Sequence, residues 1–287
     1  MKIPELEQNS APLVEHEPTP PVIELFNERK IETVAFDIDG TVLDTPSHFR
    51  KILFSLGLET VNNHLHDIED LPSSQIALDL EKEVYRVYYA NNKRPELLGS
   101  QYKQALEKYL SPSDFRNSKG LDALIKKYEN ICYTTSPEAY EKTLRILTML
   151  DHWNIYTIFN SHAEDPWTGK KVNYMGNLFN PKKLYQYVTT PITRKKDKDS
   201  WIESARRANS KPENCMATGD NLEADILGAI DAGYKNVTWI NRYIENYEEF
   251  LSQHISFDEL RERDIYFFMI RNIGEIEYLT VKDRILF

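Results

Sequence analysis

The sequence predicts an α/β fold in which a parallel, Rossmann-like sheet is flanked by helices and carries an inserted α-helical domain. Short apolar runs rich in β-branched and aromatic residues recur along the 287-residue chain, and none alternates cleanly with polar residues. This pattern is typical of strands buried on both faces of a parallel sheet. Helical patterns separate several of the runs, which indicates βαβ units. The runs are residues 33–37, 131–134, 155–159, 215–218 and 236–240.

Residues 46–119 carry helical patterns without a recognisable strand pattern, which predicts a helical domain inserted after the first strand. We expect residues 23–45 and 120–287 to form the α/β core with a C-terminal extension. Residues 1–22 are rich in Glu and Pro and are expected to form a flexible arm. The apolar positions at helical spacing are Phe49, Ile52, Leu53 and Leu56; Ile76, Leu80, Val84 and Val87; and Tyr102, Leu106 and Tyr109.

Composition favours a globular protein of the cytoplasm. The formal net charge is −10, and 41% of the residues are hydrophobic. This acidic balance disfavours a nucleic-acid polymer as partner, because such binding relies on neutralising phosphates with basic side chains. We find neither a secretory signal nor a run of apolar residues long enough to span a membrane. Cys132 and Cys215 lie in apolar runs and are expected to be buried free thiols.

Two pairs of carboxylates follow predicted strands. Asp37 ends the run at 33–37 and Asp39 follows it, while Asp220 and Asp225 follow the run at 215–218. The carboxyl ends of parallel strands meet at one edge of a sheet, where open α/β sheets bind ligands, so we expect these side chains to converge. Converging buried carboxylates need a shared proton or a cation. Oxygen ligands alone suit Mg²⁺.

Two further segments are suited to bind phosphate. The run 131–134 is predicted to be a strand that ends at the hydroxyl groups of Thr134 and Thr135, next to a helix capped by Ser136. The N–H groups and dipole of a helix N-terminus favour an anion there. The basic segment 194–198 can supply a cation between the hydroxyl site and the second pair of acids.

The chain resembles the haloacid dehalogenase (HAD) superfamily, in its phosphatase branch. The stretch Asp37–Asp44, DIDGTVLD, matches the first motif of the family, and Gly219, Asp220 and Asp225 match its last motif. The helical insert resembles a cap of the C1 type. The segment 162–194 is longer than we expect for a simple member of the family, and we interpret it as a loop elaboration.

The remaining motifs of the resemblance are matched less closely. Thr134 is the best match to the strand-terminal Thr/Ser of the family. Lys195 matches the phosphate-binding lysine on its spacing from Gly219, and Lys196 and Lys198 are alternatives.

The resemblance implies a phosphatase mechanism. Asp37 attacks phosphorus and forms an aspartyl-phosphate, and Asp39 protonates the leaving group and then deprotonates water. Mg²⁺ is held by Asp37, Asp39, Asp220 and Asp225, and the substrate phosphate is held by Thr134, Thr135 and Lys195. The predicted function is therefore a Mg²⁺-dependent phosphomonoester hydrolase that acts on a small phosphorylated metabolite.

Other functions remain open at this point. A phosphomutase on the same scaffold uses the same motifs, and a regulatory protein could retain the fold without activity. A dehalogenase is disfavoured because it leaves Asp39 and Asp220 without a role. The sequence specifies neither the substrate nor the oligomeric state.

Overall fold

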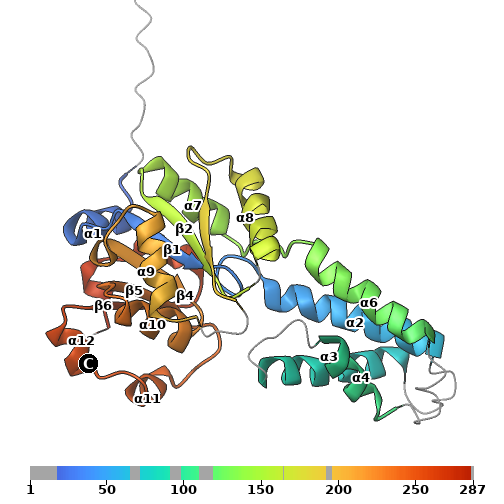
Figure 1. The fold of residues 1–287 in the computed structure, drawn as a ribbon. Helices are drawn as coiled ribbons and strands as arrows, with labels where there is room; N and C mark the ends of the chain where they lie inside the picture. Colours follow the sequence, from blue (N-terminus) through green and yellow to red (C-terminus); the bar gives the residue numbers. More distant parts are fainter. Residues whose placement is uncertain are drawn as a thin grey trace, which may run out of the picture.

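The computed structural model describes residues 18–64, 72–90, 98–109, 119–163, 165–191 and 196–285, and among these residues six strands form one parallel sheet (Figure 1). The strands are β1 (Thr33–Asp37), β2 (Tyr156–Ser161), β3 (Gln186–Thr189), β4 (Cys215–Gly219), β5 (Asn236–Ile240) and β6 (Tyr266–Ile270). Their order is β3-β2-β1-β4-β5-β6. Because the chain builds outward from β1 on both sides, the sheet has a switch point between β1 and β4, where open α/β sheets bind ligands.

Both faces of the sheet are covered, as the continuous apolar runs predict. In β1, Val34 and Phe36 belong to one hydrophobic cluster and Ala35 belongs to the other, since successive side chains point to opposite faces. The first cluster includes α1 (Pro21–Arg29), α7 (Thr143–His152) and α8 (Asp165–Phe179). The second includes α9 (Lys198–Arg207), the π-helix η3 (Leu222–Leu227) and α10 (Gly228–Asp231). The predicted α/β class is thereby confirmed.

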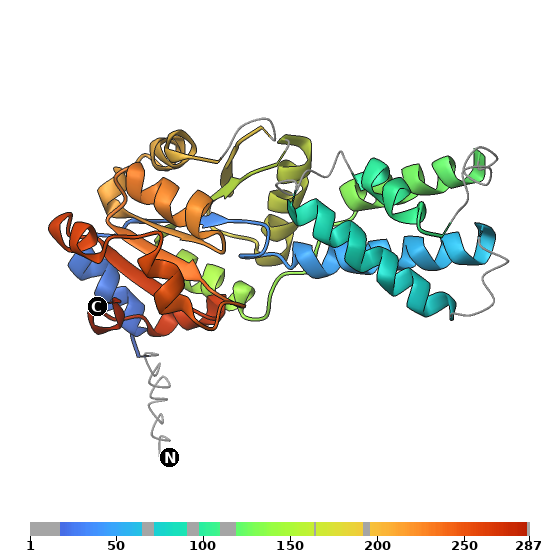
Figure 2. The ribbon, with the colours of Figure 1, turned by 90° about the horizontal axis from the view of Figure 1, so that it is seen from below.

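A helical domain lies beside the sheet and extends away from it (Figures 1 and 2). It consists of α2 (Thr45–His64), α3 (Ser73–Ala90), α4 (Leu98–Leu106) and α6 (Lys119–Thr134), which pack around a third hydrophobic cluster. We call this domain the cap. α2 begins at Thr45, directly after the loop that follows β1, so one rigid element connects the cap to the sheet edge.

The strand predicted over residues 131–134 is wrong, because these residues form the last turn of α6. The buried positions Leu121, Leu124, Ile125 and Cys132 follow helical spacing and face the cap cluster. This sixteen-residue amphipathic face outweighs the β-propensity of four residues. The helical domain therefore extends beyond residue 119, where the insert was expected to end. Cys132 is a buried free thiol in a helix, whereas Cys215 is one in β4.

The segment 162–194, interpreted as a loop elaboration, instead contains α8 and the edge strand β3. The C-terminal extension contains α11 (Tyr247–Ser252), α12 (Phe257–Glu262), β6 and two short 3₁₀ helices, η4 (Ile273–Tyr278) and η5 (Val281–Asp283). β6 completes the sheet beside β5, and η4 packs against α1 and α7. The extension is thus part of the core.

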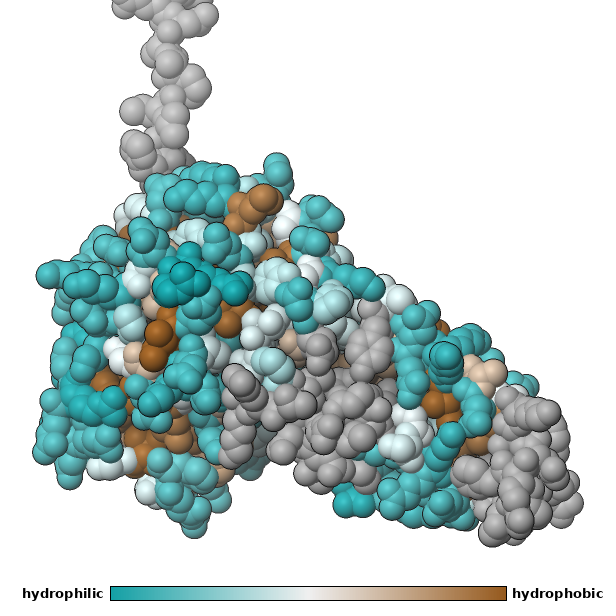
Figure 3. All heavy atoms as spheres, viewed as in Figure 1, coloured by the Kyte–Doolittle hydropathy of each residue, from teal (hydrophilic) through white to brown (hydrophobic). Residues whose placement is uncertain are grey.

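At the N-terminus, α1 begins within the predicted arm, whose residues 1–17 lie outside the described part of the chain. A further short 3₁₀ helix, η2 (Pro212–Asn214), precedes β4. The face shown in Figure 3 is mainly hydrophilic, with apolar patches over the sheet domain. Among the described helices, none combines the length and apolarity needed to cross a membrane.

Candidate functional site

Three carboxylates meet at the carboxyl edge of the sheet, beside the switch point between β1 and β4. Asp37 is the last residue of β1, Asp220 directly follows β4, and Asp225 lies in the first turn of η3. One oxygen atom of each carboxylate lies within 4.8 Å of the other two. Asp37 and Asp225 are buried, at 7% and 1% exposure. The fold thus brings together three of the acids that the sequence selects.

A single buried lysine bridges two of these acids. Lys196 Nζ lies 2.7 Å from Asp37 Oδ1 and 2.6 Å from Asp225 Oδ1, and its side chain is 1% exposed. Among the three lysines considered from the sequence, Lys196 is the one that the structure places in the acidic cluster. Lys195 lies outside the described residues, and Lys198 is exposed at the start of α9.

The cluster carries more negative charge than Lys196 compensates. Burial and the neighbouring acids raise the pKa of Asp37 from 3.8 to about 8, although Lys196 opposes the shift. Asp37 Oδ2 is buried and accepts no hydrogen bond from the described residues. An unpartnered oxygen among three converging carboxylates suits a small oxygen-seeking cation, so the residues present fit a divalent metal ion.

Asp39 is held by two donors at the rim of this cluster. The Thr45 hydroxyl donates to Asp39 Oδ1 from the first residue of α2. Lys171 Nζ lies 2.5 Å from the same oxygen and reaches it from α8. Lys171 is 3% exposed, and burial lowers the pKa of its ammonium group, while Asp39 counteracts the shift. Asp39 is thus paired with a lysine that the sequence analysis does not select.

The loop between β1 and α2 brings Asp39 back over the sheet edge. Gly40 adopts a φ of +87°, and a Cβ at this position would lie far inside van der Waals contact with Asp220 Oδ2. The Arg242 guanidinium donates to the carbonyl of Gly40 and lies 4.1 Å from the ring centroid of Tyr140. The loop is therefore fixed by its own conformation and by the cation of Arg242, which follows β5.

We expect Gly40→Ala to destabilise the protein by roughly 1–3 kcal/mol, because it combines a disfavoured φ with a clash against Asp220. Gly176→Ala in α8 is the matched control, since no atom beyond its chain neighbours and the adjacent backbone of α8 lies within 4 Å of its added Cβ. The control should be neutral or slightly stabilising. Thermal unfolding of both variants measures the difference, and equal melting temperatures would contradict the role given to Gly40.

The hydroxyl groups predicted to bind phosphate lie in the cap. Thr134 is exposed at the end of α6, and its hydroxyl donates to the Asn130 carbonyl at 2.8 Å. The Thr135 hydroxyl likewise donates to the Ile131 carbonyl at 2.7 Å and contacts His48 Nε2. Because residues 131–134 are helical, the strand end that placed both hydroxyls at the sheet edge does not exist. The phosphate role inferred for them therefore loses its structural basis.

A different hydroxyl lies at the sheet edge. Ser161 ends β2, immediately after Asn160, which is paired in register with Asp37. Ser161 Oγ and Asn160 Oδ1 are buried and have no hydrogen-bond partner among the described residues. The sequence contains a signal for a hydroxyl at the sheet edge, because the predicted strand 155–159 ends two residues before Ser161.

Comparison with known proteins identifies the family. A family model described as haloacid dehalogenase-like hydrolase matches residues 31–233, which is well over half of the chain. The chain belongs to this hydrolase family. The matched segment contains Asp37, Asp39, Lys171, Asp220 and Asp225, so the HAD-like hydrolase presents its acidic cluster within the family domain. The comparison with curated protein sequences finds no match.

Solved structures share the fold of this HAD-like hydrolase at low sequence identity. The magnesium-bound HAD hydrolase YfnB of Bacillus subtilis aligns at 16% identity with a TM-score of 0.55, covering 86% of this chain and 96% of its own. A protein assigned as a β-phosphoglucomutase from Thermotoga maritima aligns at 12% identity and 0.55, covering 86% and 97%. A dehalogenase in an intermediate complex aligns at 13% and 0.51, covering 88% and 98%. Since their activities differ, the shared fold does not select the reaction.

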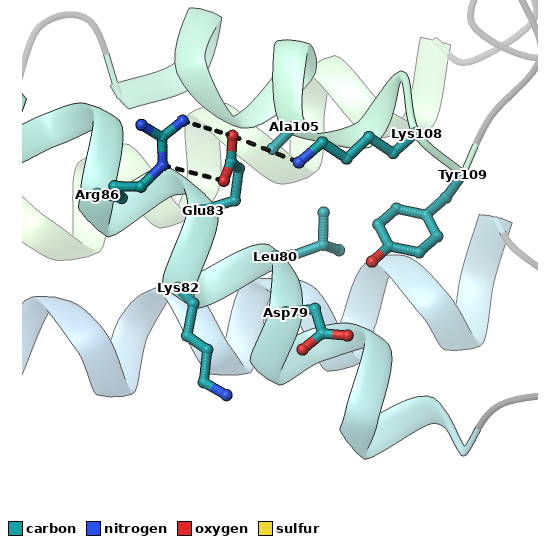
Figure 4. Close-up of a pocket in the computed structure, with 8 residues that line it drawn as sticks. All are labelled: Asp79, Leu80, Lys82, Glu83, Arg86, Ala105, Lys108 and Tyr109. Atoms are coloured by element: carbon teal, nitrogen blue, oxygen red, sulfur yellow. Dashed lines mark hydrogen bonds and ion pairs between the residues drawn. The ribbon is translucent and has the colours of Figure 1, made fainter.

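A pocket of about 350 Å³ lies elsewhere in the HAD-like hydrolase, between α3 and α4 of the cap (Figure 4). Glu83 at this pocket forms ion pairs with Arg86 and Lys108, which neutralise its carboxylate. Only cap residues line the pocket, so it contains none of the acids at the sheet edge. We assign the chemistry to the sheet edge.

Proposed function

We propose that this chain is a Mg²⁺-dependent phosphomonoester hydrolase that acts on a small phosphorylated metabolite through an aspartyl-phosphate on Asp37. The observation that carries the proposal is the charge of the cluster. One carboxylate oxygen from each of Asp37, Asp220 and Asp225 lies within 4.8 Å of the other two, and Lys196 compensates only part of their charge. Displacement of a halide by a carboxylate needs no such excess of acids, whereas phosphoryl transfer with a bound metal does.

In the proposed reaction, an oxygen of Asp37 forms a bond to phosphorus as the bond from phosphorus to the leaving oxygen breaks. Asp39 gives its proton to that oxygen. In the second step Asp39 takes a proton from water, whose oxygen attacks the same phosphorus, and the Asp37 carboxylate is restored as free phosphate leaves. The two steps together consume one water molecule for each ester cleaved.

Mg²⁺ would be held by Asp37, Asp220, Asp225 and the backbone carbonyl of Asp39, and when bound it supplies positive charge that ionises Asp37 and offsets the charge of the phosphate. Lys196 is proposed to bind phosphate oxygens in addition to its ion pair with Asp37. The Ser161 hydroxyl, which is buried and unpartnered, is proposed as a second donor to phosphate in place of Thr134 and Thr135.

The cap is proposed to be of the C1 type and to admit small substrates, since a helical domain beside the sheet edge restricts the space for a large one. The proposal keeps the cytoplasm as the location, because Cys132 and Cys215 are free thiols. The substrate is proposed to be a small molecule, with neither a nucleic-acid polymer nor a membrane as partner.

We expect Ser161→Ala to lower kcat/KM by about 10²-fold, as is typical when a buried donor to a transition-state oxyanion is removed. Thr134→Ala and Thr135→Ala are the matched controls and should stay within about twofold of the wild type, because both hydroxyls donate to backbone carbonyls of α6 and lie in the cap. Steady-state kinetics with one phosphate ester compare the three variants. A larger loss of kcat/KM in either threonine variant would instead place the phosphate site in the cap.

The test of the proposed function is a phosphate-release screen with sugar phosphates, nucleoside monophosphates, phosphoglycolate and p-nitrophenyl phosphate, each with Mg²⁺ and with EDTA. Release that requires Mg²⁺ supports the proposal. Isomerisation of a sugar phosphate without free phosphate would replace it with a mutase, and halide release from a 2-haloacid would replace it with a dehalogenase. No turnover, together with no effect of Mg²⁺ on the melting temperature, would indicate a non-catalytic protein.

A further inference from the structure

A second buried lysine forms an ion pair with Asp39, as Lys196 does with Asp37. Lys171 belongs to none of the sequence motifs considered above, yet it is 3% exposed and its Nζ lies 2.5 Å from Asp39 Oδ1. Burying an ammonium group is costly unless it is paired and hydrogen-bonded. A buried lysine whose carboxylate partner is 27% exposed at the site therefore indicates a role at that carboxylate.

The Thr45 hydroxyl and the Lys171 ammonium group converge on the same oxygen of Asp39. Two donors from different elements, α2 and α8, restrict the rotation of the carboxyl group more than either donor does alone. Restricted rotation has a functional consequence, since a general acid must lie within hydrogen-bond reach of the leaving oxygen. Misplacement by about 1 Å can cost about 10²-fold in rate.

The position of Lys171 is in turn fixed by the cap. Lys171 Nζ lies 4.2 Å from the ring centroid of Trp167, one helical turn earlier on α8. The Trp167 ring stacks on Phe49 of α2 with a centroid distance of 5.9 Å and an interplanar angle of 14°, and Trp167 belongs to the cap cluster. Phe49, Trp167 and Lys171 therefore form a continuous contact from the cap to Asp39.

We propose that Lys171 is a positioning residue that holds the Asp39 carboxyl group in line with the leaving oxygen, and that Trp167 holds Lys171 beneath the cap. This inference rests on the proposed function, because it assigns Asp39 the acid and base steps. The competing explanation is that Lys171 binds the substrate phosphate directly. The two explanations predict different effects on kcat/KM, depending on whether the leaving group of the substrate needs a proton.

The experiment compares Lys171→Met and Lys171→Arg with Lys170→Met, an exposed neighbour on α8. It measures kcat/KM for an alkyl phosphate, whose alkoxide needs a proton to leave, and for p-nitrophenyl phosphate, whose leaving group is stable as an anion. For Lys171→Met we expect a loss of about 10–10²-fold with the alkyl ester and within about threefold with the nitrophenyl ester. Lys171→Arg should recover part of the loss, and Lys170→Met should match the wild type.

A packing variant tests the link to the cap. Trp167→Leu should reproduce part of the leaving-group-dependent loss while Lys171 is still present, because the ammonium group loses its aromatic neighbour. Equal losses of kcat/KM for the two esters in Lys171→Met, with weaker inhibition by inorganic phosphate, would assign Lys171 to phosphate binding and overturn the inference.

A second measurement does not depend on activity. A double-mutant cycle of Asp39→Ala and Lys171→Met, followed by denaturant unfolding with EDTA present, should show coupling between the two residues, whereas the cycle with Lys170→Met should show none. If no phosphate ester is hydrolysed but the coupling is present, the proposed function fails and the pairing of Lys171 with Asp39 stands. Absence of coupling overturns the inference even if the enzyme is an active phosphatase.

Discussion

Asp37→Asn is expected to abolish phosphate release, with a loss of at least about 10⁴-fold, and to raise the melting temperature of the metal-free protein at pH 8. The loss of activity follows because an amide cannot form the aspartyl-phosphate. The gain in stability follows because the variant removes a buried carboxylate from a cluster with Asp220 and Asp225 that carries excess negative charge. One substitution therefore has opposite effects on function and on stability.

The pH dependence of stability tests the electrostatic part of this prediction. The pKa of Asp37 is about 8 in the folded protein against 3.8 for an ordinary aspartate, so the folded state binds more protons than the unfolded state between these values. The contribution of Asp37 to stability is complete below about pH 4 and is lost as the pH rises towards 8. The difference in melting temperature between Asp37→Asn and the wild type should therefore grow from pH 5 to pH 8 in EDTA.

The matched control for these melts is Asp231→Asn, which removes an exposed carboxylate from α10. Its melting temperature should follow that of the wild type across the same pH range. Mg²⁺ should stabilise the wild type more than Asp37→Asn, because a ligand that binds only the native state stabilises it. A constant difference between Asp37→Asn and the wild type from pH 5 to pH 8 would show that burial does not raise the pKa of Asp37.

The sequence predicts the acidic cluster well because its geometry follows from local rules. Asp37 ends β1 and Asp220 directly follows β4, on either side of the switch point, and the carboxyl ends of such parallel strands must share one edge. Gly40 and Gly219 belong to the same stretches, and a Cβ at Gly219 would collide with Asp225. The sequence alone therefore predicts that these acids lie together at the sheet edge.

The residues that the sequence analysis missed depend on long-range packing. Lys171 meets Asp39 across 132 positions of chain, and nothing in a helical Lys-Lys pair indicates which lysine is buried. Thr134 was selected because residues 131–134 resemble a short buried strand, and Ser161 was not considered. Residues 131–134 instead form the last turn of α6. This helix begins at Lys119, at the boundary where the helical insert was predicted to end. The strand wrongly assigned to residues 131–134 produced the error in the phosphate site.

Lys196→Met is expected to destabilise the metal-free protein by about 3–5 kcal/mol, the usual cost of leaving buried charges without their partner. Lys196 Nζ is shared between Asp37 and Asp225, and the side chain lies over the ring of Trp201. Although burial opposes it, the two carboxylates raise the pKa of Lys196, so the ammonium form predominates at neutral pH. Methionine has a similar length and keeps the contact with Trp201, which limits the loss to the charge.

The same variant should lower kcat/KM by about 10³-fold, because it removes a cation that offsets charge on both Asp37 and the phosphate. Lys198→Met and Lys195→Met are the controls, and both should retain near-wild-type activity. Activity lost in Lys195→Met but retained in Lys196→Met would place the phosphate-binding cation outside the described residues.

Combining Lys196→Met with Asp225→Asn separates stability from chemistry. The double variant removes one of the two carboxylates that Lys196 leaves unpaired, so its melting temperature should recover towards the wild type. Its activity should not recover, because the second substitution also removes a proposed metal ligand. Recovery of both would mean that Lys196 acts only by stabilising the fold, whereas a recovered melting temperature with activity well below that of the Asp225→Asn single variant assigns its positive charge to the reaction.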